Sequence, residues 1–122
     1  MDYQACNYHY RDKTYSCSTS LAMSLIGGKW KSVLIYYLLG GEKRFSELRK
    51  LAGPITERTL SLQLKQLEED GLISRRVYTK KPPLKVTYRL TEIGETLRPV
   101  VLAIARWGGG LAAEQGKIVL LE

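Results

Sequence analysis

The stretch that decides the fold runs from Arg44 to Gly71 and reads RFSELRKLAGPITERTLSLQLKQLEEDG. Its second half carries three leucines at helical spacing, namely Leu60, Leu64 and Leu67. Such spacing places one apolar stripe along a helix. Gly53-Pro54 breaks the chain before this helix, and Thr56 is a suitable residue to cap its first turn.

The first half of the stretch has the same helical spacing, in Phe45, Leu48, Leu51 and Ala52. A short helix, a Gly-Pro turn and a longer helix in succession predict a helix-turn-helix. Lys43 and Arg44 lie where the short helix is expected to begin. They are either solvated surface cations or the partners of a phosphate at a helix N-terminus.

The segment after the longer helix predicts a strand hairpin that would form a wing. From Leu84 to Leu90 apolar and polar residues alternate, which is typical of a half-buried strand. Leu72–Tyr78 is its expected partner, with Ile73 and Val77 on the buried side. Pro82-Pro83 cannot donate backbone hydrogen bonds, so it marks the tip of the hairpin. The expected fold is mainly α with a small β-hairpin wing, a winged helix-turn-helix.

One face of the longer helix lies opposite the leucine stripe, and it carries Arg58, Leu62 and Lys65, flanked by Thr59, Ser61 and Gln66. Guanidinium, amide, hydroxyl and apolar groups read base edges in a DNA major groove, although the same residues also suit an ordinary solvated face. The wing favours DNA, because it holds six basic residues and no acidic one between positions 75 and 89, a footprint for phosphate. These are Arg75, Arg76, Lys80, Lys81, Lys85 and Arg89.

The whole chain has 122 residues, a net charge of +7 and a pI near 9.5, which suits one domain with a polyanionic partner. No apolar run approaches the roughly 18–20 residues of a transmembrane helix, and the N-terminus is polar rather than a signal peptide. We therefore expect a cytoplasmic protein without a membrane partner. One histidine, and neither a carboxylate pair nor a glycine-rich phosphate loop, point away from an enzyme or a cofactor.

Residues 1–16 form a polar arm with no clear period, which we expect to be loose or packed on a partner subunit. Four of these residues are tyrosines, namely Tyr3, Tyr8, Tyr10 and Tyr15. Cys6, His9 and Cys17 have no fourth ligand nearby and match no familiar zinc spacing, so no metal site is predicted.

Two helices are expected before the helix-turn-helix, over Ser18–Ile26 and from Trp30 to Leu38. The apolar stripe of the second helix is interpreted as core, with an aromatic ligand pocket as the alternative; it consists of Trp30, Val33, Leu34, Tyr37 and Leu38. After the wing, Thr91 is expected to cap a last helix that Pro99 kinks. Its wide apolar face exceeds the core of a short domain, so we expect it to pack on a second copy together with the first helix. The predicted interface consists of Leu21, Leu25, Val100, Val101, Ile104 and Trp107.

Several spaced motifs of a known family occur in order along the chain. They are Leu25-Ile26-Gly27-Gly28-Lys29-Trp30-Lys31, Lys43-Arg44-Phe45-Ser46-Glu47-Leu48, Ile55-Thr56-Glu57-Arg58-Thr59-Leu60, Leu64-Lys65-Gln66-Leu67-Glu68-Glu69-Asp70-Gly71-Leu72, Pro82-Pro83, Val86-Thr87-Tyr88-Arg89-Leu90-Thr91 and Ala105-Arg106-Trp107. From about Cys17 to Trp107 the chain resembles the HxlR-type regulators, a branch near the MarR family. We divide it into the arm 1–16, a winged helix-turn-helix domain with N- and C-terminal dimerisation helices over 17–107, and a tail 108–122 that Gly108–Gly110 loosens.

The resemblance implies a homodimeric, sequence-specific transcription factor on a pseudo-palindromic DNA site, more commonly a repressor. It assigns base reading to Arg58, Thr59, Ser61, Leu62 and Lys65. It assigns backbone contacts to Lys43, Arg44, Ser46 and the wing lysines Lys80, Lys81 and Lys85, to which the basic footprint adds Arg75 and Arg76. Position 62 is often polar in the family, whereas here it is leucine. Leu62 either contacts a thymine methyl group or adds packing. The operator sequence of other family members therefore does not transfer to this chain.

Some members sense electrophiles or oxidants through a cysteine ahead of the first shared helix, and Cys17 matches that position. Ser18 follows it, where the family often has proline. A helix N-terminus lowers the pKa of a thiol and favours the reactive thiolate, whereas the alternative is a buried structural thiol. Cys6 either resolves an oxidised Cys17 as a disulfide, within or between chains, or has no role.

A second hypothesis is a winged-helix module that binds a protein or RNA through the basic ribbon, because a fold does not determine a function. The operator, the target gene, the inducer and the sign of regulation stay open. A small effector bound at the dimer interface is a further option.

Overall fold

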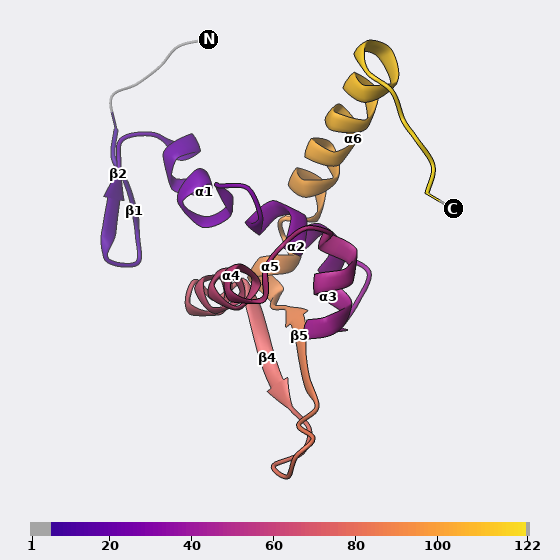
Figure 1. The fold of residues 1–122 in the computed structure, drawn as a ribbon. Helices are drawn as coiled ribbons and strands as arrows, with labels where there is room; N and C mark the ends of the chain where they lie inside the picture. The colour runs from indigo at the N-terminus through magenta and orange to yellow at the C-terminus, as the bar shows by residue number, and fades with distance from the viewer. Residues whose placement is uncertain (1–5, 122) are drawn as a thin grey trace.

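The structure is a computed structural model and describes residues 6–121. In chain order the elements are β1 (Tyr8–Tyr10), β2 (Lys13–Tyr15), α1 (Ser18–Ile26), α2 (Lys31–Leu38), β3 (Lys43–Arg44), α3 (Phe45–Ala52), α4 (Glu57–Glu69), β4 (Ile73–Val77), β5 (Val86–Leu90), α5 (Glu92–Glu95) and α6 (Arg98–Gln115). Figure 1 shows a central body of α2, α3, α4 and α5, from which the β1–β2 hairpin, the β4–β5 wing and α6 project in different directions.

The core lies where α2, α3, α4 and the base of the wing meet. Its fully buried side chains are Leu34, Ile35, Leu38, Leu48, Leu60, Leu64, Leu67, Leu72, Ile73 and Val101. The leucine stripe predicted for the longer helix is therefore confirmed, and Trp30 packs partly buried against this core as expected. Leu51, predicted on the inner side of α3, is instead exposed, because the stripe continues from Leu48 to Ala52, one turn on.

The turn of the helix-turn-helix begins at Gly53, whose φ of +82° is a left-handed conformation that glycine adopts without steric cost. Thr56 caps α4 as predicted, because its Oγ1 accepts a hydrogen bond from the Thr59 N–H at 3.1 Å. The two helices thus take the boundaries that the sequence pattern indicates.

The wing is part of a three-stranded antiparallel sheet with the order β3-β5-β4. β4 and β5 pair from Ile73 opposite Leu90 to Val77 opposite Val86. The predicted hairpin is therefore confirmed, and its tip contains the peptide bond between Pro82 and Pro83.

Lys43 and Arg44 lie where α3 begins, as predicted, with Arg44 as its N-cap, and they also form a third strand, β3, that the sequence pattern did not predict. This strand pairs with β5, with Arg44 opposite Thr87, and two residues are too few to show a period in the sequence. Val77 and Leu84, predicted on the buried side, are exposed because the wing extends beyond the body (Figure 1).

Three expectations about the C-terminal part are also corrected. Thr91 caps the short helix α5, where its Oγ1 accepts from the Gly94 N–H at 3.1 Å. Pro99 lies in the first turn of α6, where its missing N–H has no helical partner, so the predicted interior kink does not arise. α6 then continues through Gly108–Gly110 to Gln115, and the division at residue 107 falls within this helix.

The N-terminal arm contains a hairpin that the sequence pattern did not predict. Tyr8 pairs with Tyr15 and Tyr10 with Lys13, and Arg11 takes a positive φ of 56° in the turn between them. The hairpin packs against α1. Strands of three residues are too short to give a visible period, and Tyr3 lies outside the described residues. No helix in the described part of the chain is long and apolar enough to span a bilayer.

Candidate nucleic-acid interface

The outer face of α4 carries the side chains predicted to read DNA bases. Four of the five are exposed, namely Arg58, Ser61, Leu62 and Lys65. Thr59 is half-buried, and its hydroxyl accepts a hydrogen bond from the Thr56 hydroxyl at 2.9 Å. Leu62 is 51 % exposed, so it does not serve as extra packing within the described chain. The face presents guanidinium, ammonium, hydroxyl and apolar groups side by side.

Most of the side chains predicted to contact the DNA backbone are also exposed. All five predicted wing cations are exposed, namely Arg75, Arg76, Lys80, Lys81 and Lys85. Arg44 and Ser46 are exposed as well, whereas Lys43 is half-buried with its Nζ 3.4 Å from the Gly41 carbonyl oxygen. Within residues 6–121, none of these cations forms an ion pair with a carboxylate, and neither do Arg58 and Lys65. Cations without a carboxylate partner are available to bind phosphate.

α4 and the wing meet along a groove of about 260 Å³, lined by Ser61, Lys65, Glu68, Arg75 and Tyr88. The groove brings two predicted base-reading residues and one predicted phosphate contact onto one continuous surface. Glu68 and Tyr88 were not predicted here. Among the described residues, the exposed Glu68 takes part in no side-chain hydrogen bond or ion pair.

A carboxylate outside the wing holds the wing through two hydroxyl groups. Tyr78 Oη donates to the two carboxylate oxygens of Glu42 at 2.9 and 3.0 Å, and Thr87 Oγ1 donates to Oε1 of the same group. Thr87 is a buried polar residue, with 4 % of its surface exposed. We call Glu42, Tyr78 and Thr87 the wing latch. Its partners lie 36 and 45 residues from Glu42, so no local sequence signal marks it.

The wing latch also brings the Glu42 carboxylate close to basic side chains of the wing. Hydrogen bonds from Thr87 and then Tyr78 lower the pKa of Glu42, and the charges of Arg76 and Arg89 lower it further. Two cations lie against the ring of Tyr78, with Arg76 Cζ 4.6 Å and Lys85 Nζ 4.7 Å from its centroid. Such distances are those of cation–π contacts.

Cys17 is the N-cap of α1, a position expected for serine or threonine. Its Sγ accepts a hydrogen bond from the Ser20 N–H at 3.3 Å and donates to the Ser20 Oγ at 3.2 Å. The Ser20 hydroxyl, followed by its backbone N–H, lowers the pKa of the Cys17 thiol and so favours the thiolate. Cys6 and Cys17 are both exposed free thiols in the single chain, so neither is buried in the core of its own chain.

α6 exposes most of its apolar side chains in the single chain, and Figure 1 shows it projecting from the body. The exposed members are Val100, Leu102, Ile104, Trp107 and Leu111, with Trp107 71 % exposed. Val101, predicted in the dimer interface, is 2 % exposed and packs in the core of its own chain, because α6 contacts α2 near this point. Leu21 and Leu25 are half-buried on α1.

A family model of HxlR-like helix-turn-helix proteins matches residues 25–115. The chain belongs to this family. The matched range begins after Cys17 and ends beyond Trp107, so the cysteine lies outside it.

Individual relatives agree with the HxlR assignment. The chain is 52 % identical over 97 residues to the uncharacterized HTH-type transcriptional regulator YdeP of Bacillus subtilis (strain 168), covering 80 % of this chain and 75 % of YdeP. The redox regulator HypR in its oxidized form superposes with a TM-score of 0.73 at 47 % identity, covering 77 % of this chain and 96 % of HypR. The reduced transcriptional regulator YodB from B. subtilis gives a TM-score of 0.65 at 31 % identity, covering 84 % and 97 %. The predicted winged helix-turn-helix is confirmed, and the chain is a DNA-binding transcriptional regulator rather than an enzyme.

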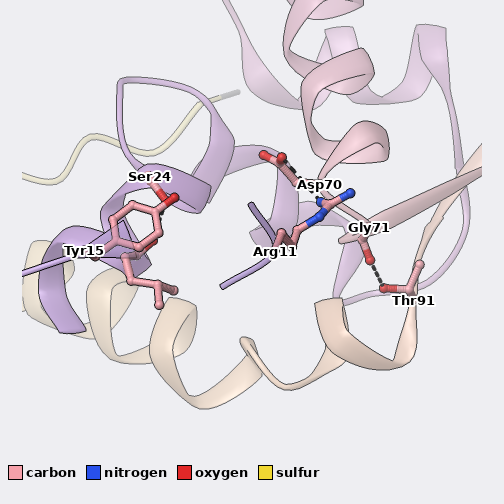
Figure 2. Close-up of polar contacts among 7 residues, drawn as sticks. Arg11, Tyr15, Ser24, Asp70, Gly71 and Thr91 are labelled. Atoms are coloured by element: carbon pink, nitrogen blue, oxygen red, sulfur yellow. Dashed lines mark hydrogen bonds and ion pairs between the residues drawn. The ribbon is translucent and has the colours of Figure 1, made fainter. Parts of the chain in front are cut away.

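In this HxlR-family chain the N-terminal hairpin lies beside the C-terminal end of α4 (Figure 2). Arg11 Nη1 is 3.8 Å from Oδ1 of Asp70, the C-cap of α4, and Tyr15 Oη accepts from Ser24 Oγ of α1 at 3.2 Å. A cavity of about 500 Å³ lies between the hairpin, α1 and α4. The segment that leads into Cys17 therefore contacts α4 directly.

Proposed function

We propose that this regulator is a homodimer that binds a pseudo-palindromic DNA site and represses transcription. Each α4 would enter a major groove and read bases through Arg58, Thr59, Ser61, Leu62 and Lys65. The single observation that carries this proposal is the exposed outer face of α4 beside a wing whose cations form no ion pair within residues 6–121. Lys43, Arg44, Ser46 and the wing cations Arg75, Arg76, Lys80, Lys81 and Lys85 would contact phosphates.

A second copy of the chain is the proposed partner of α6. The exposed apolar residues Val100, Ile104 and Trp107 are more than a monomer leaves in contact with water. Burying them in a dimer interface would stabilise the dimer by roughly 25 cal/mol per Å² of apolar surface removed from water. Leu21 and Leu25 of α1 would complete this interface. A two-fold axis between the copies would set the half-sites about one helical turn, roughly 34 Å, apart.

We also propose that Cys17 responds to oxidants or electrophiles and thereby changes DNA affinity. Support comes from its exposure, its place at the N-cap of α1 and its lowered pKa. HypR, one of the similar structures, is a redox regulator. Through the hairpin and the Arg11–Asp70 ion pair, a change at Cys17 has a route to α4.

Cys6 is the proposed disulfide partner of Cys17 within the same chain. In β1 and β2, Tyr8 pairs with Tyr15, and continuing this register by two residues brings Cys6 opposite Cys17. Facing residues of antiparallel strands have Cα atoms about 4.5–5.5 Å apart, within the roughly 4.4–6.8 Å that a disulfide spans. Cys6, as a hydrogen-bond partner of Tyr8, raises the pKa of that phenol, and Cys17 also contributes, which supports a position for both thiols near Tyr8.

Formation of this disulfide removes two electrons from the two thiols, and a two-electron oxidant such as a peroxide accepts them. The Cys17 thiolate attacks the peroxide oxygen to give a sulfenic acid and releases hydroxide. The Cys6 thiolate then attacks the Cys17 sulfur, forming the disulfide and releasing a second hydroxide.

Binding to the DNA upstream of the protein's own gene tests this function. Fluorescence anisotropy would be recorded with reduced and diamide-treated protein, and with a scrambled duplex of equal length. Preference for the upstream duplex that shifts on oxidation, and no longer shifts in Cys17→Ser, would support both the operator and the sensor. If that preference does not shift, Cys17 is not the sensor. If neither this duplex nor unbiased site selection shows a preference, the basic surface binds a protein or RNA instead.

A further inference from the structure

We propose that Glu42 is a positioning residue for DNA binding: through the wing latch it fixes the place at which the wing cations meet the DNA backbone. This inference rests on the proposed use of the wing as a phosphate-binding element. It concerns a residue that the family resemblance and the basic footprint do not include.

The position of Glu42 in the fold allows one carboxylate to hold the wing. It lies directly before β3, in the segment that follows α2, whereas Tyr78 directly follows β4, at the outer end of that strand. The Tyr78 N–H donates to the Lys85 carbonyl at 2.8 Å, so Tyr78 is also the last rung before the tip. A hydrogen bond from this residue to Glu42 therefore ties the outer part of the hairpin to the body.

The sheet gives the outer wing little support of its own. β3 pairs with β5 only at Arg44 opposite Thr87 and Lys43 opposite Tyr88. Beyond these pairs the wing is a two-stranded ribbon, and an isolated two-stranded hairpin is marginally stable in water. The latch attaches the ribbon to the body at Tyr78, outside the part that β3 supports.

The same contact places two of the proposed phosphate-binding cations. Arg76 and Lys85 lie against the Tyr78 ring, and the hydroxyl of that ring is held by Glu42. Loss of the latch would free the Tyr78 ring, and both cations would then no longer be held in fixed directions. The effect of Glu42 on DNA is thus transmitted through Tyr78.

A neutral residue at position 42 removes both the charge of Glu42 and its hold on the wing, and these two losses predict opposite changes in DNA affinity. A carboxylate among DNA-facing cations repels phosphate, so its charge alone would make Glu42→Gln bind every duplex more tightly. If Glu42 positions the wing, the same variant binds the preferred duplex more weakly. Glu68→Gln is the matched control, because it removes an equal charge from the groove between α4 and the wing but leaves the latch intact.

The test measures two independent properties of Glu42→Gln, Tyr78→Phe and Glu68→Gln. Hydrogen–deuterium exchange of residues 77–86 in the free protein reports the wing without DNA. Anisotropy titrations over a range of salt report affinity for the preferred and the scrambled duplex. Tyr78→Phe keeps the ring that both cations contact and removes only the hydroxyl, so it isolates the hydrogen bonds. Far-UV circular dichroism and thermal unfolding show that each variant is folded.

We expect faster wing exchange in Glu42→Gln and Tyr78→Phe, and a roughly three- to tenfold weaker affinity for the preferred duplex. The salt slope should fall by about one to two, since each lost phosphate contact lowers it by roughly 0.9. Glu68→Gln should exchange normally and bind both duplexes slightly more tightly. Unchanged exchange with tighter binding in Glu42→Gln would overturn the proposal, as would faster exchange with no loss of affinity. The exchange result stands even if no preferred duplex exists, which separates failure of the latch from failure of the proposed operator.

Discussion

Arg49 of α3 and Glu57 of α4 form an ion pair across the turn of the helix-turn-helix, with Arg49 Nη1 2.8 Å from Glu57 Oε1. Both side chains are largely exposed to water, where such a pair contributes only about 0–1 kcal/mol. Leu64 of α4, in contrast, is fully buried between the helices. The two helices are therefore held together by their leucine core, and the ion pair makes a small addition.

Urea denaturation should separate these two contributions. Glu57→Gln should lower the free energy of unfolding by no more than about 1 kcal/mol, and Leu64→Ala by about 2–5 kcal/mol because it leaves a cavity. Equal losses in the two variants would contradict the assignment of stability to the core.

The exposed face of α6 predicts a dimer that one charge disrupts. Trp107→Glu replaces the most exposed large apolar side chain of this helix with a carboxylate and should convert the dimer to monomer at micromolar concentration, as measured by sedimentation velocity. Gln115→Glu adds the same charge at the end of α6 and should leave the dimer intact. A wild-type monomer, or a Trp107→Glu dimer of unchanged affinity, would exclude α6 as the interface.

The hairpin register predicts that oxidation joins Cys6 and Cys17 within one chain. Diamide-treated wild type should run as a monomer on a non-reducing gel, with a mass lower by the two hydrogens that leave the thiols. A mixture of Cys6→Ser and Cys17→Ser chains, after subunit exchange, should give no covalent dimer. A covalent dimer in that mixture, absent from either variant alone, would place the disulfide between chains.

The Ser20 hydroxyl is the first cause of the lowered pKa of Cys17. Ser20→Ala should therefore raise this pKa toward its ordinary value, which reduces the thiolate fraction and the alkylation rate at neutral pH. The rate of reaction with iodoacetamide, followed against pH in a Cys6→Ser background, should move to higher pH. Ser24→Ala, on the same helix, serves as the control. An unmoved profile in Ser20→Ala would show that the hydroxyl does not tune the thiol.

The parts of the fold that local chemistry determines were predictable from the sequence. Leu60, Leu64 and Leu67 alone define the buried side of α4, and Thr56 marks its start. The opposite face followed from the same geometry, which is why the exposed positions of Arg58, Leu62 and Lys65 agree with the prediction.

The remainder depends on contacts between distant segments. β3 has two residues and exists only because β5 lies beside it, and Glu42 meets Thr87 across 45 residues of chain. Periodicity shows that a helix face is apolar but does not show what covers it. Val101 and Trp107 lie on the same apolar helix, yet only Val101 is buried in its own chain.

The central claim, that α4 reads base sequence, is tested most directly by Arg58→Ala in anisotropy titrations against the preferred and the scrambled duplex. Loss of one base-reading arginine should weaken binding to the preferred duplex by about 1–3 kcal/mol and affect the scrambled duplex much less. Lys80→Ala provides the comparison, because a phosphate contact should weaken both duplexes alike and lower the salt slope by about one unit. An equal loss on both duplexes in Arg58→Ala would contradict base reading by α4.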